Sequence, residues 1–344
     1  MKMKAAVFEK PGVPLAISEV EVPKPAAGQL LIRVHRCGIC GSDLHLTDPH
    51  SCWTVKAGTV LGHEFSGEIV ELGAGTDEKW REGDRLAGFP YIGCGTCAAC
   101  LGGEPFHCPT VLSLPTGDLV GGYGEYAVVG ADESVRLHDG VSWEQGAMTE
   151  PLAVGIHAVA VSRMRPGVRV LVLGAGPVGL ATAAVAKMMG ADSVVVTART
   201  DRRAELATTL GADAFHINDE YLAERFAKTA GGPPEIIFEC VGLPGMMGRC
   251  SDLVTHKGQI VMAGACNGFE KFLAITPTVK ELNYQFAACY TKQEFAVAQK
   301  MIASGQIDLM PMFDGLVPMN DLPTVFEQLR ADKSACKVML NPMG

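Results

Sequence analysis

Four cysteines lie close together in the segment CGTCAACLGGEPFHC, and they are Cys94, Cys97, Cys100 and Cys108. Four thiolates can complete the tetrahedral shell that zinc prefers, with Zn–S distances of about 2.3 Å and no position left for a substrate. The pattern therefore predicts a structural zinc site that holds a loop in one conformation. Ordinary thiols are one alternative, but this spacing is improbable without a metal. A DNA-binding zinc module is another, and it is disfavoured because AACLGGEPFH lacks basic residues.

A second group combines a cysteine, a histidine and a carboxylate. Cys40 lies in CGICGSDLH, and His63 and Glu64 lie in GHEFSGEIVELG. Together these residue types can form an open zinc site, in which a vacant position accepts water or substrate. A lone cysteine or histidine is more often a packing or surface residue, so the combination carries the prediction of a catalytic zinc.

A glycine-rich turn is expected to bind a dinucleotide. The segment VRVLVLGAGPVGLATAAVAKMMG places Gly174, Gly176, Pro177, Val178 and Gly179 between an apolar strand and an apolar helix. The glycines allow a tight turn and close approach of the backbone to a pyrophosphate, which the N-terminus of the helix attracts. The strand, turn and helix together make the fingerprint specific.

The end of the next strand predicts the choice of cofactor. NAD-binding proteins usually carry an acidic residue there, but SVVVTARTDRR has Ala198, followed by Arg199, Arg202 and Arg203. We expect NADP(H), with Arg199 and Arg203 as the main contacts to the 2′-phosphate and Arg202 as a further candidate. Asp201 would take the acidic role if the strand ended later. A solvated helix start is the other alternative, but cations there oppose the helix dipole.

Two kinds of domain must position these residues. Up to about residue 150, short β-rich runs such as LLIRV and YAVVG alternate with Gly/Pro-rich turns, which indicates a β-rich unit with few helices. From about Val168, strands and helices alternate, which predicts a doubly wound α/β domain. After about Tyr290, two helices and a strand are too few for a third domain. We expect this tail to pack on the first unit.

Composition excludes several classes of function. The 344 residues are 48% hydrophobic and 19% charged, which is typical of a globular enzyme of two domains. Lys+Arg 29 against Asp+Glu 38 gives a net charge of −9, which disfavours binding to nucleic acid or to an anionic membrane. No apolar run approaches the length of a membrane span, and no signal peptide is evident. A cytoplasmic location is expected.

The motifs also resemble a known family. GHEFSGEIVELG, CGSDLH and the four-cysteine loop are similar to the zinc-containing medium-chain dehydrogenase/reductase superfamily, and the similarity covers essentially the whole chain. TEPLAVGIHAV, which carries Glu150, looks most like the branch of sorbitol (polyol), threonine and glucose dehydrogenases, whereas liver-type alcohol dehydrogenases have cysteine at this position. The resemblance implies a GroES-like zinc-binding catalytic domain, a Rossmann domain and a returning C-terminal segment, at 1–153, 154–290 and 291–344.

On matching positions, the resemblance implies that Cys40 and His63 bind the catalytic zinc. Glu64 and Glu150 would bind it directly or through water, and which of them is the direct ligand stays open. Asp43 would accept a hydrogen bond from a ligand histidine and hold it in one tautomer. A helix or turn cap is the alternative role for Asp43.

The resemblance further implies a proton relay beside the zinc. A bound Zn²⁺ acts as a Lewis acid that lowers the pKa of an alcohol and so promotes hydride transfer from its carbinol carbon. Ser42 would receive the alcohol proton, and His45, with an ordinary pKa near ~6.5, would pass it towards solvent. A surface His45 with no catalytic part is the alternative. Ser42, His45 and Glu64 are thus the candidate catalytic residues.

The predicted function is that of an oxidoreductase with two Zn²⁺ per chain that moves hydride between a secondary alcohol and NADP⁺ and reversibly reduces the ketone. A hydrophobic or cyclic alcohol and a polyol remain equal candidates. The residues considered for the substrate pocket are Cys52, Trp53, Phe89, Tyr91, Phe106, Phe269 and Tyr290. Each aromatic among them is individually more often a core residue.

Two other functions and the assembly complete the expectations. A zinc-free quinone or enoyl reductase of the same fold would be separated by a metal assay, and a non-catalytic NADP(H)-binding protein by any zinc-dependent turnover. The run NYQFAACY lies where the family pairs cofactor domains edge to edge, and an unpaired strand edge favours a partner. We therefore expect a homodimer or a homotetramer.

Overall fold

A computed structural model describes residues 1–332 and 334–344 and divides into two compact units. Unit 1 comprises Met1–Glu150, Tyr290–Gln306 and Phe313–Gly344. Unit 2 comprises Pro151–Cys289 and Ile307–Met312. The domain limits predicted from the sequence are 1–153, 154–290 and 291–344. These limits stay predictions. Within the described residues, no helix is long and apolar enough to span a membrane.

Unit 2 is built on a six-stranded parallel sheet with the order β12-β11-β10-β13-β14-β15. The central strands are near-continuous apolar runs such as VLVL, because both faces of a doubly wound sheet are covered. The strands are β10 (Arg169–Leu173), β11 (Ser193–Ala198), β12 (Ala214–Ile217), β13 (Ile236–Glu239), β14 (Gln259–Met262) and β15 (Asn283–Phe286). This order confirms the predicted Rossmann-type α/β fold.

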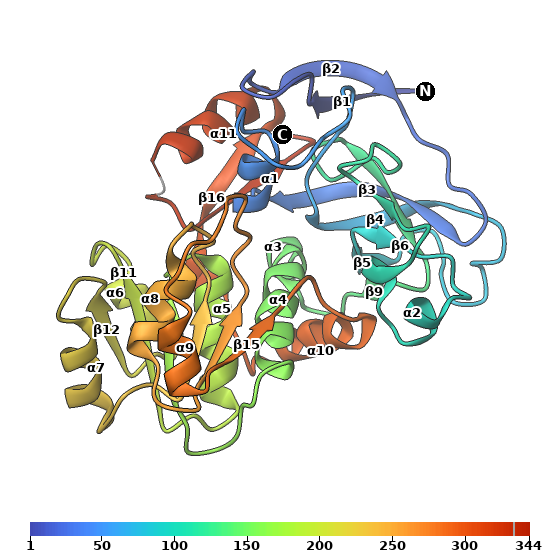
Figure 1. Ribbon diagram of the computed structural model, residues 1–344. Coiled ribbons are helices and arrows are strands. Elements are labelled where there is room, and N and C mark those ends of the chain that lie inside the picture. The colour runs from blue at the N-terminus through green and yellow to red at the C-terminus, as the bar shows by residue number, and fades with distance from the viewer. Residues whose placement is uncertain (333) are drawn as a thin grey trace. The chain divides into compact units, whose positions relative to one another are not determined.

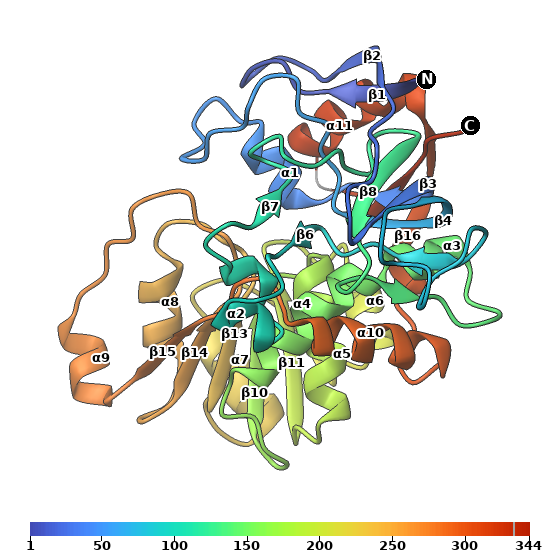
Figure 2. The same ribbon diagram turned by 90° about the vertical axis from the view of Figure 1, so that its right-hand side faces the viewer.

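Helices flank the sheet of unit 2 (Figures 1 and 2). They are α5 (Pro177–Met188), α6 (Ala204–Thr209), α7 (Leu222–Ala230), α8 (Met246–Leu253) and α9 (Ile275–Lys280), with the 3₁₀ helix η2 (Met310–Met312). Helix α4 (Thr149–Ala160) begins in unit 1 and continues in unit 2. Strand β15 lies at one edge of the sheet with α9 beside it, as Figure 2 shows.

Unit 1 contains a seven-stranded sheet with the order β16-β17-β3-β4-β5-β9, in which β8 also pairs with β3. Only β16 and β17 pair in parallel, so the sheet is mixed, as expected for the GroES-like unit. Its strands are β3 (Gln29–Gly38), β4 (Glu64–Leu72), β5 (Arg85–Ala87), β8 (Tyr126–Gly130), β9 (Val135–Arg136), β16 (Phe313–Pro318) and β17 (Lys337–Asn341). The tail residues of β17 pair directly with β3.

Short elements complete unit 1. Two further strand pairs are β1 (Lys2–Val7) with β2 (Ala16–Glu21), and β6 (Tyr91–Ile92) with β7 (Leu112–Ser113). The helices are α1 (Gly41–Leu46), α2 (Ala98–Leu101), α3 (Trp143–Ala147), α10 (Lys292–Ala303) and α11 (Leu322–Ala331), with the 3₁₀ helices η1 (Pro105–His107) and η3 (Met319–Asp321). Helix α10 starts at a capping box, in which Thr291 and Glu294 satisfy each other's backbone N–H groups.

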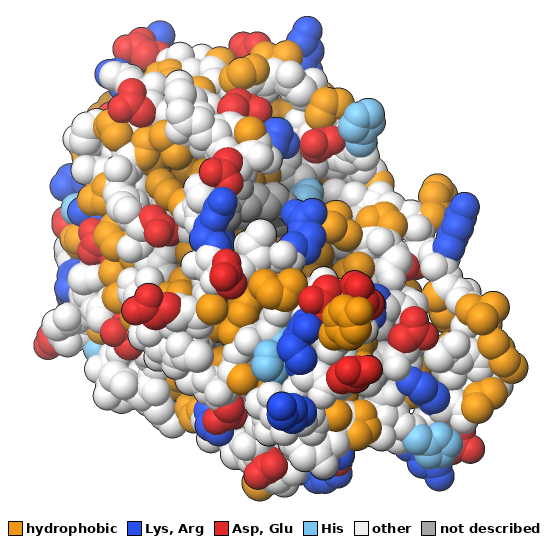
Figure 3. Space-filling model, turned by 90° about the vertical axis from the view of Figure 1, so that its left-hand side faces the viewer, with side chains coloured by type: hydrophobic (Ala, Val, Ile, Leu, Met, Phe, Trp, Pro, Cys, Tyr) orange, Lys and Arg blue, Asp and Glu red, His pale blue; other side chains and the backbone are white. Residues whose placement is uncertain are grey.

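One face of the molecule carries its acidic groups in a dispersed form. On the face drawn in Figure 3, Asp and Glu side chains alternate with Lys, Arg and hydrophobic side chains. Mixed charge of this kind is ordinary for a protein whose net charge is −9.

Candidate active site and zinc centres

Cys40, His63 and Glu64 converge beside the β3–β4 pair of unit 1. Cys40 follows β3 and is the N-cap residue of α1, and His63 directly precedes Glu64, the first residue of β4. The antiparallel register of the two strands places Gly38 opposite Glu64. One ligand atom from each of the three residues lies within 4.8 Å of the others. Strand pairing therefore brings a thiol, an imidazole and a carboxylate close enough to share one metal ion.

His63 is oriented by two further residues. The Nδ1 atom of His63 lies 3.2 Å from Oδ1 of Asp43, and the Tyr123 hydroxyl donates to Oδ2 of Asp43 at 2.6 Å. Burial opposes the charged imidazolium, but the Asp43 carboxylate and Cys40 raise the pKa of His63 well above its ordinary value. Because Nδ1 is engaged by Asp43, Nε2 is the nitrogen that is available to a metal ion.

Glu64 is paired with a buried lysine from the last strand. Lys337 in β17 donates to both carboxylate oxygens of Glu64, at 2.7 and 2.6 Å, and the two side chains are only 1% and 2% exposed. Gly38 leaves room for this carboxylate, because a Cβ at that position would lie 2.0 Å from Oε2 of Glu64. Burial disfavours the ammonium, but the Glu64 carboxylate and Cys40 raise the pKa of Lys337 above its ordinary value.

Glu150, in the first turn of α4, interacts electrostatically with His63 and Glu64. Burial raises the pKa of the Glu150 carboxyl to about 7, and the Glu64 carboxylate adds to the rise. The nearby imidazole of His63 opposes this rise. Glu64 rather than Glu150 is the carboxylate that the geometry groups with Cys40 and His63.

The two relay candidates both lie on α1. The Ser42 hydroxyl donates to Sγ of Cys40 at 3.2 Å and lies 3.3 Å from Nε2 of His63. Ser42 therefore stands at the cluster itself. His45 lies in the last turn of the same helix and is partly exposed, which is a suitable place for a group that exchanges protons with water.

The four cysteines of the second site also converge. The Sγ atoms of Cys94, Cys97, Cys100 and Cys108 lie within 4.8 Å of one another, in a lobe, residues 91–113, that contains α2 and η1. Backbone N–H groups point at the sulfurs, as from Cys97 to Sγ of Cys94 at 3.3 Å. Hydrogen bonds from Thr96 and from backbone groups lower the pKa of Cys94 to about 5. A low pKa favours the thiolate, which is the form of cysteine that binds zinc.

The glycine-rich turn has the geometry that its motif requires. Gly174 follows β10 with a φ of 109°, which favours glycine, and Gly176 is the N-cap residue of α5. Pro177 and Val178 form the first turn of that helix. A Cβ at Gly179 would lie 1.9 Å from the carbonyl oxygen of Gly174, so helix and turn are in direct backbone contact. The free N–H groups at the start of α5 can therefore receive a phosphate.

The residues predicted to choose the cofactor follow β11. That strand ends at Ala198, so Asp201 lies beyond it, in the turn before α6. Arg199 is exposed, whereas Arg203 is half-buried and donates from Nη1 to the carbonyl of Ala175 at 2.8 Å. Arg203 thus ties the start of α6 to the glycine-rich turn, a contact that the sequence did not reveal.

The residues considered for a substrate pocket fall into different environments. Phe89 and Tyr290 are buried among other aromatic rings, while Tyr91 and Phe106 are half-buried in the cysteine lobe. Phe269 is 91% exposed, and Cys52 and Trp53 also lie at the surface. Packing with neighbouring rings accounts for Phe89 and Tyr290, as the ordinary behaviour of aromatic residues suggested.

Two residues of the site, Tyr123 and Lys337, were missed by the sequence reasoning. Tyr123 lies in GGYGEYA, which carries no chemical signature. Lys337 offered a weak signal, because a lone lysine at the start of the apolar strand KVMLN must either reach solvent or find a buried partner.

Comparison with known proteins identifies the family. Residues 26–139 match the model of the alcohol dehydrogenase GroES-like domain, and residues 177–304 match that of the zinc-binding dehydrogenase domain. The chain is 33% identical to a sorbitol dehydrogenase of Gallus gallus over 95% of this chain and 93% of that protein.

Solved structures agree with these matches. A Sinorhizobium meliloti 1021 protein bound to NADP superposes with a TM-score of 0.89 at 27% identity, covering 99% of this chain and 100% of that one. The alcohol dehydrogenase RspB of Escherichia coli CFT073, in complex with NADH, gives 0.89 at 30% identity over 99% of both chains. The chain thus belongs to the zinc-containing medium-chain dehydrogenase/reductase superfamily, in the branch of the sorbitol and threonine dehydrogenases.

Proposed function

We propose that the protein is a zinc-dependent, NADP(H)-preferring alcohol dehydrogenase that interconverts a secondary alcohol and its ketone. The observation that carries the proposal is the convergence of Cys40, His63 and Glu64, whose donor atoms lie within 4.8 Å of one another. A thiolate, an imidazole and a carboxylate are three ligands that suit zinc and leave its fourth position open. A zinc-free reductase would have no use for this set.

The residues around the site have distinct roles in the proposal. Cys40, His63 and Glu64 would hold the ion, and Glu150 would bind it directly or through water. A Zn²⁺ held there supplies Lewis-acid chemistry that makes a substrate hydroxyl more acidic. Ser42 receives the proton of that hydroxyl, and His45 transfers it towards water.

Supporting residues fix this geometry. Asp43, itself held by Tyr123, keeps the proton of His63 on Nδ1, so that Nε2 remains free to bind the ion. Lys337 neutralises Glu64 and holds both of its oxygens in place. These contacts orient the ligands before any substrate arrives, which is the arrangement that a precise reaction centre requires.

The second zinc is proposed for the cysteine lobe. Four sulfurs at mutual distances within 4.8 Å fill a tetrahedral shell and leave no room for substrate. Cys94, Cys97, Cys100 and Cys108 are therefore assigned a structural role, and the chain is expected to hold two zinc ions.

The preference for NADP(H) rests on the turn after β11. No carboxylate stands at Ala198, so nothing there repels a 2′-phosphate, and Arg199 presents an exposed guanidinium next to it. Arg203 donates a hydrogen bond to the glycine-rich turn and adds positive charge beside the expected pyrophosphate site. Structural relatives were solved with NADP in one case and NADH in another, so the choice depends on these side chains.

The substrate is proposed to be a secondary alcohol, either a hydrophobic or cyclic one or a polyol. A relative with 33% identity is named sorbitol dehydrogenase, which supports the polyol. The burial of Phe89 and Tyr290 in aromatic packing removes part of the argument for an apolar pocket. The cytoplasmic location stays a prediction from the sequence.

The purified protein is expected to contain about two zinc ions per chain and to reduce NADP⁺ faster than NAD⁺ with secondary alcohols or polyols. Arg199→Ala should lower kcat/KM for NADP⁺ about tenfold to a hundredfold, because a charge-assisted contact is worth roughly 1.5–3 kcal/mol. The same variant should leave kcat/KM for NAD⁺ unchanged. Steady-state kinetics over a panel of cyclic alcohols and polyols, with metal analysis of the same sample, measure all three quantities.

The exposed Arg81, in unit 1, provides the matched control, since Arg81→Ala removes the same charge away from β11. Equal losses with NADP⁺ and NAD⁺ in the Arg199 variant would contradict the proposed phosphate contact. One zinc per chain, bound by the cysteine lobe alone, would contradict the catalytic site.

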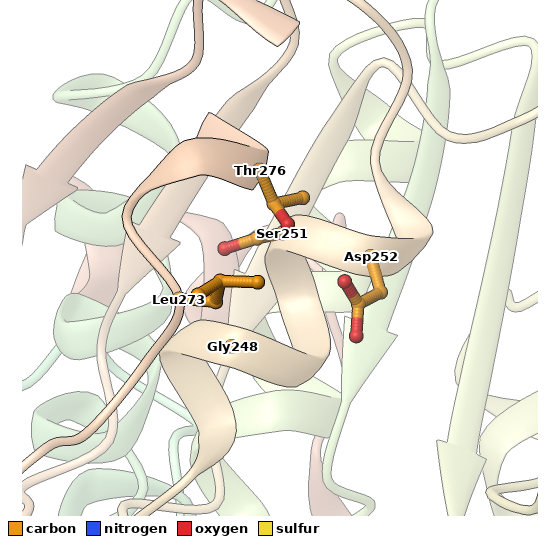
Figure 4. Close-up of a pocket in the computed structure, with 5 residues that line it drawn as sticks. All are labelled: Gly248, Ser251, Asp252, Leu273 and Thr276. Atoms are coloured by element: carbon orange, nitrogen blue, oxygen red, sulfur yellow. The ribbon is translucent and has the colours of Figure 1, made fainter. Parts of the chain in front are cut away.

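Self-association through unit 2 is also proposed. Strand β15 ends the sheet, so one row of its backbone groups is unpaired within it. Several large apolar side chains near it are exposed, namely Phe269, Leu273, Ile275, Val279 and Phe286. Between α8 and the chain at Leu273 and Thr276 there is a cavity of about 180 Å³, lined also by Gly248, Ser251 and Asp252 (Figure 4). Such a surface fits a second copy of the chain, related by a two-fold axis.

The protein is expected to sediment as a dimer or tetramer, and Phe286→Lys should shift it to the next smaller species. A lysine at the strand edge opposes edge-to-edge pairing because it places like charges across the two-fold axis. Analytical ultracentrifugation gives the masses. Met189→Lys, which changes the exposed C-cap residue of α5, should leave the mass unchanged. A monomeric wild-type protein would refute the proposal.

A further inference from the structure

The helix that carries both relay candidates is too short to be stable by itself. Helix α1 has six residues, Gly41–Leu46, and contains Ser42 and His45. Isolated helices of this length are marginal in water, because the first hydrogen-bonded turn is costly to form. The last carbonyl groups of a helix also have no partner within it. Contacts with other elements must therefore hold α1 in place.

Arg330 of α11 supplies such a contact at the C-terminal end of α1, and the two helices lie side by side in unit 1 (Figure 1). The Nη1 atom of Arg330 donates to the carbonyl of Leu44, and Nη2 donates to the Thr47 hydroxyl at 2.7 Å. Thr47 is the C-cap residue of α1, and its hydroxyl donates in turn to the carbonyl of Asp43 at 2.9 Å. One guanidinium thus binds two groups at the end of the helix, where the helix dipole also favours a cation.

The guanidinium of Arg330 is itself held in one orientation. Its Nε atom donates to the Glu327 carboxylate, one turn earlier in α11, at 3.0 Å. The carboxylate of Asp48 lies 3.7 Å from Nη1, and the side chain of Arg330 is only 25% exposed. The guanidinium carbon lies 5.6 Å from the centroid of the Phe326 ring. Because several neighbours fix the planar group, it can in turn fix the end of α1.

Helix α11 reaches α1 by a second route, which acts on a side chain. Phe326 is buried and meets Tyr123 edge-on at 6.2 Å between ring centroids. The Tyr123 hydroxyl donates to one oxygen of Asp43, and the other oxygen lies 3.2 Å from Nδ1 of His63. Helix α11 therefore supports both the backbone at the end of α1 and the residues that orient the Asp43 carboxylate.

We propose that Arg330 is a positioning residue for the proton relay, because it fixes the C-terminal end of α1 and thereby the places of Ser42 and His45. This inference rests on the proposed function, which by itself gives Arg330 no part in the reaction. An arginine with a merely structural role would stabilise unit 1 and leave turnover by the folded protein unchanged. A positioning arginine affects kcat while the zinc ligands and the cofactor site stay intact.

The order of α1 can be measured without turnover. Arg330→Met removes the guanidinium and keeps an unbranched side chain. In hydrogen–deuterium exchange followed by mass spectrometry, peptides that cover residues 41–48 should exchange about tenfold to a hundredfold faster in this variant, because the local opening of α1 no longer breaks a charge-assisted hydrogen bond. Peptides from β4, which carries Glu64, should exchange as in the wild-type protein.

Steady-state kinetics of the same variant test the consequence for the reaction. Arg330→Met should lower kcat for alcohol oxidation about tenfold to a hundredfold, since a small displacement of a reacting group has an effect of this size. KM for NADP⁺ and the zinc content should stay at their wild-type values, because the cofactor site and the metal ligands are unchanged. The ratio of kcat in H₂O to kcat in D₂O should rise, because the slowed step is a proton transfer.

Two further variants complete the design. Thr47→Val keeps the shape of the side chain and removes the hydroxyl that joins Arg330 to Asp43. It should show the same changes to a smaller degree, and it tests the inference even if Arg330→Met folds poorly. Gln328→Ala, at an exposed position of α11, is the matched control and should change neither the exchange of residues 41–48 nor kcat.

The outcomes that overturn the inference differ from those that overturn the proposed function. Wild-type exchange of residues 41–48 in Arg330→Met and Thr47→Val would show that Arg330 does not hold α1. Faster exchange with an unchanged kcat, or a lower kcat with an unchanged solvent isotope effect, would refute the positioning of the relay. A zinc-loaded wild-type protein that oxidises no alcohol would refute the function itself, and the inference with it, whatever the exchange rates.

Discussion

His63→Ala and Cys40→Ser are each expected to lower kcat for alcohol oxidation by about a thousandfold or more. Either change removes one of the three donor atoms that lie within 4.8 Å of one another, and Lewis-acid stabilisation by the ion is worth several kcal/mol. NADPH should still bind with near-normal affinity, because the glycine-rich turn at Gly174–Gly179 belongs to unit 2. Steady-state kinetics, NADPH fluorescence titration and metal analysis measure the three effects.

The metal content distinguishes loss of the ion from general damage. Each variant should retain about one zinc per chain, bound by the cysteine lobe. His256→Ala changes an exposed histidine of unit 2 and should leave kcat and zinc content unaltered. A variant at His63 or Cys40 with near-normal kcat would show that the catalytic-zinc assignment is wrong.

Lys337→Met should lower the free energy of unfolding of unit 1 by about 3–5 kcal/mol. The ammonium of Lys337 is the partner of both oxygens of Glu64, and the carboxylate is only 2% exposed. In the metal-free protein, removal of the lysine leaves a buried carboxylate without its counter-charge, which costs more than the pair contributes. All three tryptophans, Trp53, Trp80 and Trp143, belong to unit 1, so their fluorescence during urea unfolding reports on this unit.

A second substitution tests the electrostatic cause of that effect. Glu64→Gln combined with Lys337→Met removes both charges and should recover a large part of the lost stability. Lys300→Met, at an exposed position of α10, should change the unfolding free energy by less than about 0.5 kcal/mol. If Lys337→Met were as stable as wild type, the buried pair would not hold the site together.

Most of the fold follows from local patterns in the sequence. The apolar runs VLVL and SVVVTA have the length of buried strands, and the glycines of GAGPVG allow the turn that joins β10 to α5. These features depend on neighbours in the chain, which periodicity and turn chemistry describe well. The same holds for the cysteine lobe, whose four cysteines are close in the sequence.

Contacts between distant segments could not be predicted in this way. Lys337 and Glu64 are separated by 273 positions, and Tyr123 and Asp43 by 80, and no spacing rule connects such pairs. Tyr290 was considered for the substrate pocket, since an aromatic residue in a sequence does not show which rings will surround it. The contact from Arg203 to Ala175 likewise depends on how the turn after β11 folds back, which residue types alone do not determine.

The sheet of unit 1 also constrains the order in which the molecule can form. Strand β17 pairs with β3, although the two strands are far apart in the sequence. The whole of Pro151–Cys289 lies between them, so β3 is synthesised long before its partner. The parallel sheet of unit 2 is made from contiguous sequence and can fold on the ribosome before β17, the late neighbour of β3, has been synthesised. Until β17 emerges, Glu64 has no buried counter-charge. The group of Cys40, His63 and Glu64, the proposed metal site, is therefore completed only after the strands of unit 2 have been synthesised.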